Sequence, residues 1–361
     1  MGFFYSINSN TSKEKKVKNI TKVIFVIIGA FIGAGFASGQ EIYLFFFKYG
    51  INGIIGIIIS SIILGIIISK TLKIIKKNNI ENYEEFLNII LKNKNKKSEL
   101  SKLINLIVNT FILVTFFIMI AGFGTYFSQQ YGLNQIIGSS ILALITYIIL
   151  NTNVKGVVKV NEIIVPILII LVVIIGFLNL KNLPLIQIKN YLIPNNSLEF
   201  ILKSIIYASY NSILLIPVLI TLNKYIKNEK QTTIIGLISA LIILTMSILI
   251  FLLLSKVDVN IENLEMPAVY VVSNMLKILE YIYGFIILGS IFTTTISLGV
   301  SFLQNTSKNK KSYTQIALIM CITSVIISKI GFSNLVNMLY PIFGYLGILQ
   351  IWKILKNKNY Y

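Results

Sequence analysis

Ten stretches of this chain are long and apolar enough to cross a lipid bilayer, and this feature limits the possible folds more than any other. A membrane-spanning helix needs about 20 mostly apolar residues. Hydrophobic residues make up 55% of the 361 residues and charged residues only 12%, about half the charged share of a soluble domain. The sequence therefore predicts an all-α polytopic membrane protein with spans at about 23–47, 51–72, 103–127, 135–150, 160–180, 198–222, 233–255, 278–303, 314–330 and 333–355.

The lysines fall mainly on one side of these predicted spans. All 32 basic residues are lysines, and with the N-terminus inside, 25 of them lie in inner segments and 5 in outer loops. Because inner loops of membrane proteins carry the excess of basic residues, this pattern predicts a cell-membrane protein with cytoplasmic N- and C-termini. The formal charge of +19 is then expected to face an anionic inner leaflet, and we expect no nucleic-acid partner.

The composition also excludes several chemistries. There is no His, which removes imidazole proton relays, His-ligated metals and His-based triads. The single Cys321 allows neither an internal disulfide nor a thiolate metal cage, and Asp258, the single Asp, cannot form an aspartyl protease pair. We therefore expect no enzyme activity, no catalytic residue, no metal site and no cofactor other than a coupling ion, Na⁺ or H⁺.

The first stretch contains signals that interrupt a helix. Four of the eleven residues from Gly29 to Gly39 are glycines, and each weakens a helix by about 1 kcal/mol relative to Ala. The run Ser38-Gly39-Gln40-Glu41 then fits a capping box, with Ser38 as N-cap and Glu41 at the third helical position. We predict two half-helices, about 23–32 and 39–47, that meet near Gly33–Ala37. The alternative is that these small residues only allow close helix packing.

The sixth stretch contains a polar interlude, Tyr207-Ala208-Ser209-Tyr210-Asn211-Ser212, followed by Pro217. Ten spans place the sixth in the opposite direction to the first, so the chain divides into two halves of inverted topology. Interrupted spans at equivalent positions of such halves point to a transporter's binding site near the bilayer midplane. There, freed N–H groups can hold a carboxylate and freed carbonyls can hold a cation. The predicted domains are tails at 1–22 and 356–361 and one transport domain at 23–355, with repeats at about 23–180 and 198–355.

Polar side chains within the spans need a role because an ionisable group in the bilayer is costly. Glu41 is either part of the capping box or an outer gate or protonatable carboxylate, and Lys203 is expected to pair with it across an outer vestibule. In span 8, Thr294 and Thr295 can complete an oxygen cage for a small hard cation with the carbonyls of Gly29 and Ile32. The alternative is that these hydroxyls bond to their own helix.

Three other segments are interpreted from their pattern. The apolar residues Tyr83, Phe86, Leu87, Ile90 and Leu91 predict an amphipathic helix that either lies in the membrane interface or braces the bundle. The outer segments Lys181–Asn196 and Asn263–Leu276 each contain Pro, and we interpret them as lids.

The run IGAFIGAGFASGQE at Ile28–Glu41 resembles the first-helix motif of the YkvI-like membrane proteins, a group classed with the amino acid permeases. These are grouped with the amino acid–polyamine–organocation superfamily, whose members share the leucine-transporter fold of five-plus-five inverted repeats with broken helices 1 and 6. The resemblance implies that the amides of the small-residue segment take the substrate carboxylate and that the span 6 break contacts the rest of the substrate. By the same resemblance, Gly29 and Ile32 with Thr294 and Thr295 form the ion site. The acidic extension at Glu41 departs from most permeases and leaves the polarity of the substrate open.

These observations predict a secondary transporter that moves an amino acid or similar small zwitterion by alternating access, driven by Na⁺ or H⁺. The alternative is a non-transporting receptor on the same fold, as in spore germination subunits. The predicted substrate-binding residues lie at the two interruptions and are Gly33, Ala34, Gly35, Phe36, Ser38, Tyr207, Ala208, Ser209, Tyr210 and Asn211.

Overall fold

The computed structural model describes residues 19–91, 99–180, 199–255, 264, 266–275, 277–330 and 332–356. The predicted lid Lys181–Asn196 lies outside the described residues, as do part of the lid Asn263–Leu276 and most of the two predicted tails. The first helix is Asn19–Phe31, and the elements that follow it are α2 (Ala34–Ala37), α3 (Gln40–Phe45), η1 (Phe47–Tyr49), α4 (Ile51–Asn78), α5 (Tyr83–Ile90), α6 (Glu99–Tyr131), α7 (Gln135–Leu150), α8 (Asn153–Leu180), α9 (Glu199–Thr221), η3 (Asn223–Tyr225), α10 (Glu229–Leu254), α11 (Pro267–Ser273), α12 (Lys277–Thr306), α13 (Lys310–Ile327), η5 (Ser328–Ile330) and α14 (Phe332–Lys356).

The predicted all-α membrane architecture is confirmed. Among the described residues, eight helices are long and apolar enough to cross a membrane, and two shorter apolar helices occupy the first and fourth predicted stretches. The outer faces carry many exposed large apolar side chains, such as Leu144 on α7 and Ile170 on α8. A water-soluble protein does not expose so large an apolar surface, so these faces are those that contact lipid.

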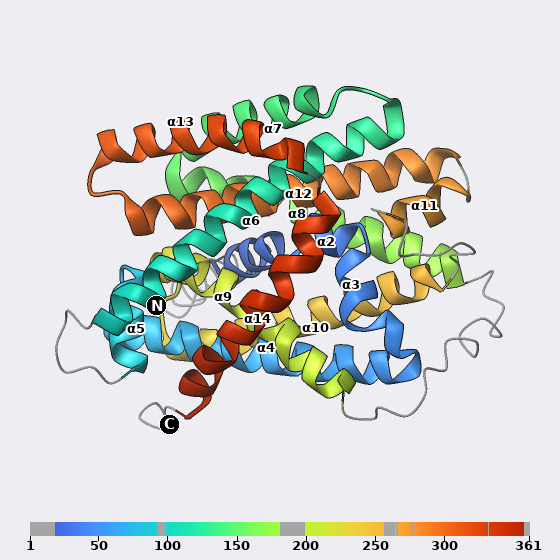
Figure 1. Ribbon diagram of the computed structural model, residues 1–361. Coiled ribbons are helices and arrows are strands. Elements are labelled where there is room, and N and C mark those ends of the chain that lie inside the picture. Colours follow the sequence, from blue (N-terminus) through green and yellow to red (C-terminus); the bar gives the residue numbers. More distant parts are fainter. Residues whose placement is uncertain are drawn as a thin grey trace, which may run out of the picture.

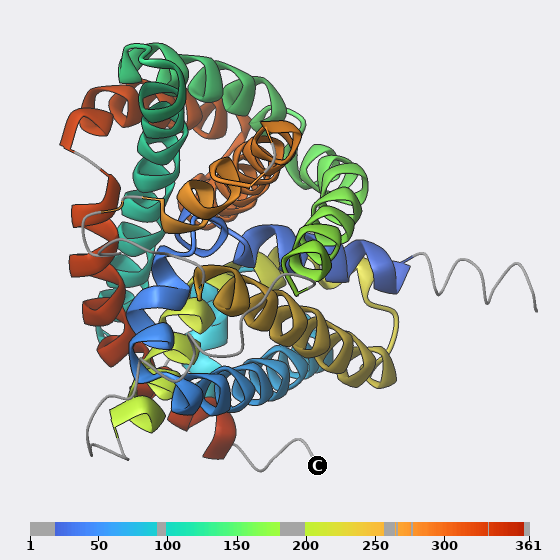
Figure 2. The ribbon, with the colours of Figure 1, turned by 90° about the vertical axis from the view of Figure 1, so that its right-hand side faces the viewer.

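The centre of the bundle is formed by α9 and α12, the two most buried of the long helices. Figure 1 shows α5 and the C-terminal end of α14 at one end of the bundle and α11 at the other. In Figure 2 the broken first helix crosses the middle, with α12 on one side and α4 and α10 on the other. The backbone groups at the break in the first helix therefore face the interior of the protein.

The predicted interruption of the first helix is confirmed, although it takes a different form. The helix stops at Phe31, and Gly33 is extended (φ −89°, ψ −172°) before the single turn of α2. A second interruption follows at Gly39, which has a positive φ of 82° that only glycine adopts without strain. The segment Gly33–Ala37, which we predicted to be unwound, is thus mostly a short turn of helix with a break at each end.

The predicted capping box is not formed. The N-cap of α3 is Gly39 rather than Ser38; the Ser38 hydroxyl donates to the Gly35 carbonyl at 3.2 Å and accepts from the Gln40 N–H at 3.4 Å. Glu41 does not reach back to the N-cap because its carboxyl group accepts a hydrogen bond from the Tyr210 hydroxyl on α9. A tertiary contact has therefore replaced the local one.

The predicted break in span 6 was wrong, because α9 is a continuous helix from Glu199 to Thr221. The polar side chains bond to the carbonyls one turn earlier: Ser209 to Ile205 at 2.7 Å and Ser212 to Ala208 at 2.6 Å. This back-bonding satisfies polar groups inside the membrane without unwinding the helix. The interlude also lacks glycine, so the helix is not weakened as the first one is.

The amphipathic segment forms α5 and braces one end of the bundle, since its apolar residues Tyr83, Phe86, Leu87 and Ile90 are buried. A group of asparagines holds this end together. The side-chain amide of Asn305 on α12 donates to Asn105 at 2.9 Å and to Asn109 at 2.6 Å on α6. Its oxygen accepts from the backbone N–H of Tyr83 at 3.2 Å. One side chain thus links three helices.

We expect Asn305→Ala to lower the free energy of unfolding by about 2 kcal/mol, because the partly buried Tyr83 N–H and Asn109 side-chain oxygen lose the bonds that Asn305 makes to them. Thermal unfolding of the purified protein in detergent measures the change. The matched control is the exposed Asn151→Ala, since the Asn151 amide donates to the Tyr147 carbonyl at 2.9 Å and accepts only an exposed bond of 3.4 Å from Thr314 on α13. Equal losses in the two variants would mean that the three-helix network contributes nothing to stability.

Candidate functional site at the broken first helix

A threonine on α12, Thr294, contacts the backbone at the end of the first helix. The Thr294 hydroxyl lies 2.8 Å from the Gly29 carbonyl oxygen and 2.9 Å from the Ile32 carbonyl oxygen. Thr294 is buried, at 3% exposure. These are three of the four groups that the sequence predicted for a cation site, and the fold brings them together. Carbonyl and hydroxyl oxygens are the donors that a small hard cation prefers.

Thr295 does not join this group. Its hydroxyl donates to the Ile291 carbonyl of its own helix at 2.6 Å, as the alternative interpretation of the hydroxyl cluster expected. Successive residues of a helix point about 100° apart, so a helix that directs Thr294 at the first helix turns Thr295 elsewhere. The role predicted for Thr295 is therefore not supported by its position in this structure.

Asn161 on α8 is a neighbour of this group that sequence reasoning missed. It is fully buried, and its amide nitrogen donates to the Val157 carbonyl at 2.8 Å. Its side-chain oxygen has no hydrogen-bond partner among the described residues and lies against Gly29, where a Cβ would collide with it. A buried amide oxygen without a partner is rare, and this one lies beside Gly29, whose carbonyl belongs to the group around Thr294.

The break also frees a backbone N–H, and a methionine occupies the space in front of it. The Ala34 N–H donates to the Met119 sulfur on α6 at 3.3 Å. A thioether is a weak acceptor, so this N–H is satisfied less well than it would be by a carboxylate. In the sequence of span 3 no feature distinguishes Met119 from the other apolar residues, because only the tertiary fold places it here.

Glu41 lies on the other side of α2. It is 3% exposed, and its carboxyl group accepts from the Tyr210 hydroxyl. It also folds back against Gly35, where a Cβ would lie 2.5 Å from the carboxyl oxygen. The absence of a side chain at position 35 is what makes room for this carboxyl group.

Aromatic rings surround the Glu41–Tyr210 pair. Tyr210 stacks on Tyr340 of α14 with centroids 4.8 Å apart and on Phe45 of α3 at 5.5 Å. Tyr207 lies edge-on to Tyr210 at 5.3 Å. The faces of such rings attract organic cations, so a carboxyl group inside an aromatic cluster suits a ligand with an ammonium group.

The predicted pair between Glu41 and Lys203 is not formed. Among the described residues no lysine ammonium makes an ion pair with Glu41, and Lys203 is only half-buried. The membrane interior disfavours bringing a hydrated ammonium inward, and a tyrosine hydroxyl meets the same need without a charge.

The other predicted site residues lie on the faces of α2 and α9 that are buried in the bundle. Phe36 packs edge-on to Phe31 at 5.3 Å. The Asn211 amide donates to the Tyr207 carbonyl at 3.0 Å, and Ser209 bonds within the same helix. Ala208 is fully buried. The structure thus brings the α2 residues and Tyr207 and Tyr210 together, whereas the polar groups of Ser209 and Asn211 are engaged by their own helix.

At the end that carries α11 the chain closes over this region. The Ala268 N–H donates to the Ser38 carbonyl at 2.9 Å, and the Tyr283 hydroxyl donates to the Ala37 carbonyl at 2.8 Å. Two carbonyls freed by the second interruption are therefore satisfied by α11 and α12.

We expect Gly35→Ala to abolish function while leaving the fold intact. The new methyl group would meet the Glu41 carboxyl oxygen at 2.5 Å and force that side chain out of position. Transport or binding assays, together with size-exclusion chromatography, measure the two effects. Gly289→Ala is the control, because its Cβ would meet the end of the Leu168 side chain at 3.1 Å, which can move aside. If Gly35→Ala had normal activity, the position of the Glu41 carboxyl group would not matter for function and Glu41 would not be a site residue.

Comparison with solved structures identifies the fold. The chain superposes on the Eremococcus coleocola manganese transporter, solved in complex with an aromatic bis-isothiourea substituted compound, with a TM-score of 0.63 over 93% of this chain and 78% of the transporter at 13% identity. A variant of the same transporter gives a TM-score of 0.60 over 93% of this chain and 79% of that one at 14% identity. The chain therefore has the fold of a membrane transporter.

Comparison with known sequences identifies the family. No family model matches the chain. The Bacillus subtilis (strain 168) protein YyaD is 26% identical over 335 residues, which cover 91% of this chain and 93% of YyaD. The membrane protein YkvI of the same organism is 30% identical over 353 residues, which cover 96% of this chain and 98% of YkvI. The resemblance carried by the first-helix motif thus extends along almost the whole chain, and the protein belongs to the YkvI-like membrane protein family.

Proposed function

We propose that this protein is a secondary active transporter of an amino acid or a similar small zwitterionic solute, coupled to Na⁺ or H⁺. In this proposal the chain crosses the cell membrane ten times as two inverted repeats, with both termini in the cytoplasm. The observation that carries the proposal is the break in the first helix, which places a cluster of oxygens and a buried carboxyl group on opposite sides of one turn of backbone.

The solute would lie between α2 and the aromatic cluster around Tyr210. Its ammonium group would contact Glu41 and the ring faces, and its carboxylate would replace the Met119 sulfur as the acceptor for the Ala34 N–H. Both interactions are charge-assisted, which makes them stronger than the contacts that they replace. A zwitterion satisfies both ends at once, whereas a simple amine or a simple acid satisfies only one.

Na⁺ is the coupling ion that the oxygen group suits. The carbonyls of Gly29 and Ile32, the hydroxyl of Thr294 and the amide oxygen of Asn161 supply neutral oxygens from three segments of the chain. A cation bound among them would hold the first helix, α8 and α12 in one arrangement. H⁺ is the second candidate, because Glu41 is a buried carboxyl group beside the proposed solute position.

Manganese, which the name of the structural neighbour gives as its cargo, is supported less well. Within the residues that the structure describes, no group of three His, Cys, Asp or Glu side chains gathers in positions to hold a metal ion. The oxygens described around Thr294 are all neutral, and they include none of the carboxylate ligands that suit a divalent cation such as Mn²⁺.

The experiment that tests the proposal is uptake into sealed vesicles that contain the purified full-length protein. Radiolabelled amino acids are supplied first with an inward Na⁺ gradient and then with a pH gradient, against vesicles without protein. We expect accumulation of at least one amino acid that collapses when an ionophore removes the driving gradient. Saturable binding without accumulation under either gradient would indicate a receptor, and neither binding nor uptake of any zwitterion would refute the proposal.

A further inference from the structure

A groove on the lipid-facing side of α4 and α10 is separate from the site above. It has a volume of about 430 Å³. α4 and α10 approach closely here, since a Cβ on Gly236 would lie 2.6 Å from the Gly65 carbonyl oxygen. Larger side chains on either side of this contact form the walls, and Ile354 of α14 completes the lining.

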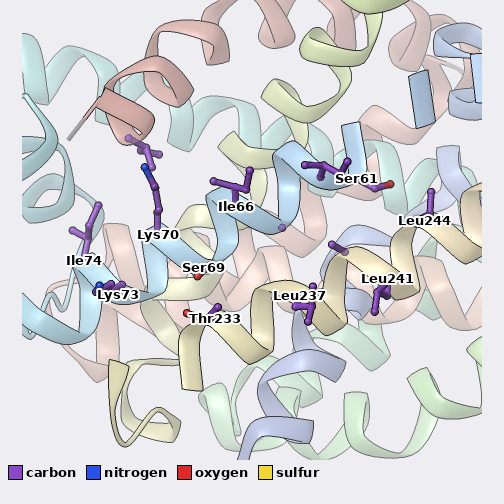
Figure 3. Close-up of a pocket in the computed structure, with 14 residues that line it drawn as sticks. Ser61, Ile66, Ser69, Lys70, Lys73, Ile74, Thr233, Leu237, Leu241 and Leu244 are labelled. Atoms are coloured by element: carbon purple, nitrogen blue, oxygen red, sulfur yellow. The ribbon is translucent and has the colours of Figure 1, made fainter. Parts of the chain in front are cut away.

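The walls of the groove are apolar and open to the membrane. Ile62 and Leu237 are 55% and 62% exposed, and Ile66 and Leu241 are also exposed. Figure 3 shows Ile66, Leu237 and Leu241 along α4 and α10, with Lys70 and Lys73 on α4 toward one end and their side chains pointing in different directions. The lining runs along α4 from Ser61 to Ile74, which is about 20 Å of helix and compares with about 15 Å for the hydrocarbon of one leaflet.

Two lysines, and no acidic residue, are among the described residues that line the groove. Lys70 donates to the Leu355 carbonyl at 3.1 Å, and Lys73 lies 3.7 Å from the Glu229 carboxylate, which is 44% exposed. The hydroxyl-bearing residues Ser69 and Thr233 line the groove beside the two lysines. A phosphate group can accept hydrogen bonds from these two ammonium groups and two hydroxyl groups, and the Glu229 carboxylate beside Lys73 is exposed to solvent.

We propose that this groove binds one anionic phospholipid of the leaflet that faces the lysine-rich end of α4. The phosphate would lie between Lys70 and Lys73, and one acyl chain would lie along Ile66 and Leu237. Basic pockets between membrane helices are the usual recognition sites for anionic lipid headgroups. A bound lipid would bridge α4, α10 and α14; α4 and α14 pack against the central α9, and α10 packs against α4.

Native mass spectrometry of the purified full-length protein, titrated with phosphatidylglycerol, tests the proposal. Phosphatidylcholine with the same acyl chains is the comparison lipid, and sn-glycerol 3-phosphate supplies the headgroup without a chain. We expect one tight phosphatidylglycerol adduct that phosphatidylcholine and glycerol phosphate do not replace. The Lys70→Gln/Lys73→Gln variant should weaken this adduct by roughly tenfold or more.

Lys353→Gln/Lys356→Gln is the matched control, because it removes the same charge from lysines that lie over the Trp352 ring and outside the groove lining. It should retain the adduct. Unfolding temperatures in lipid-free detergent identify a variant that has lost its fold, and Leu237→Trp, which fills the groove without changing charge, should also weaken the adduct. The proposal would be overturned if the groove variants kept the phosphatidylglycerol adduct as fully as the control variant does. It would also be overturned if phosphatidylcholine or glycerol phosphate bound as tightly as phosphatidylglycerol.

Discussion

Replacement of Thr294 by Val is expected to lower the apparent affinity for Na⁺ by roughly tenfold or more, since even groups that only support metal ligands contribute 10–100-fold. Val keeps the shape of Thr but removes the hydroxyl that lies 2.8 and 2.9 Å from the two freed carbonyls. The affinity is measured as the Na⁺ concentration that gives half-maximal uptake, and independently as the Na⁺-dependent rise in unfolding temperature.

Two further variants separate a ligand role from a structural one. Thr294→Ser retains the hydroxyl and should restore most of the affinity. Thr295→Val removes a neighbouring hydroxyl that is bonded within its own helix and should change the affinity little. If Thr295→Val were as damaging as Thr294→Val, or if neither changed the Na⁺ dependence, the oxygens around Thr294 would not be the ion site.

Replacement of Glu41 by Gln is expected to reduce solute binding by at least roughly 30-fold. Truncating one partner of a buried charge pair typically costs about 2 kcal/mol or more, and the ammonium group of a zwitterion would lose its carboxylate partner in this site. The fold should persist, because the Gln side-chain oxygen can still accept from the Tyr210 hydroxyl. Equilibrium binding of the solute identified in the vesicle screen measures the loss.

Glu162→Gln is the control for this change. Glu162 pairs with Lys22 at 3.2 Å near the surface, where an ion pair contributes about 0–1 kcal/mol, so we expect unchanged binding. Loss of pH-driven uptake in Glu41→Gln with solute binding intact would instead assign Glu41 to H⁺ coupling. If Glu41→Gln bound and transported the solute like the wild type under both gradients, Glu41 would act neither in solute binding nor in H⁺ coupling.

The break in the first helix could be predicted from its local sequence, whereas the continuity of α9 could not. Four glycines within eleven residues weaken the helix whatever surrounds it, so the interruption was predictable. The polar interlude of α9 carries no such backbone weakness. Its polar groups had two ways to be satisfied, by unwinding toward a cavity or by bonding back to their own helix, and the structure uses the second.

At the candidate site, the hydrogen-bond partner of Glu41 also could not be predicted from the local sequence. A local pattern predicted a capping box and a charge pair with Lys203, but Glu41 accepts from Tyr210, which is 169 residues away in the chain. The contact between Thr294 and the first helix was predicted through the family resemblance, whereas Met119 and Asn161 were not predicted as site residues. Apolar and amide side chains give no signal of their own until the fold sets them beside a freed backbone group.

The sequence by itself determined the membrane location of the chain, the positions of most of its spans and the weak point of the first helix. Each of these follows from apolar length or glycine content, which act within about 20 residues. Only the tertiary structure decided which oxygens gather around Gly29, which hydroxyl meets Glu41 and which lysines border the groove between α4 and α10. These depend on contacts between helices far apart in the chain, where the cost of leaving a polar group unpaired in the membrane selects the partner.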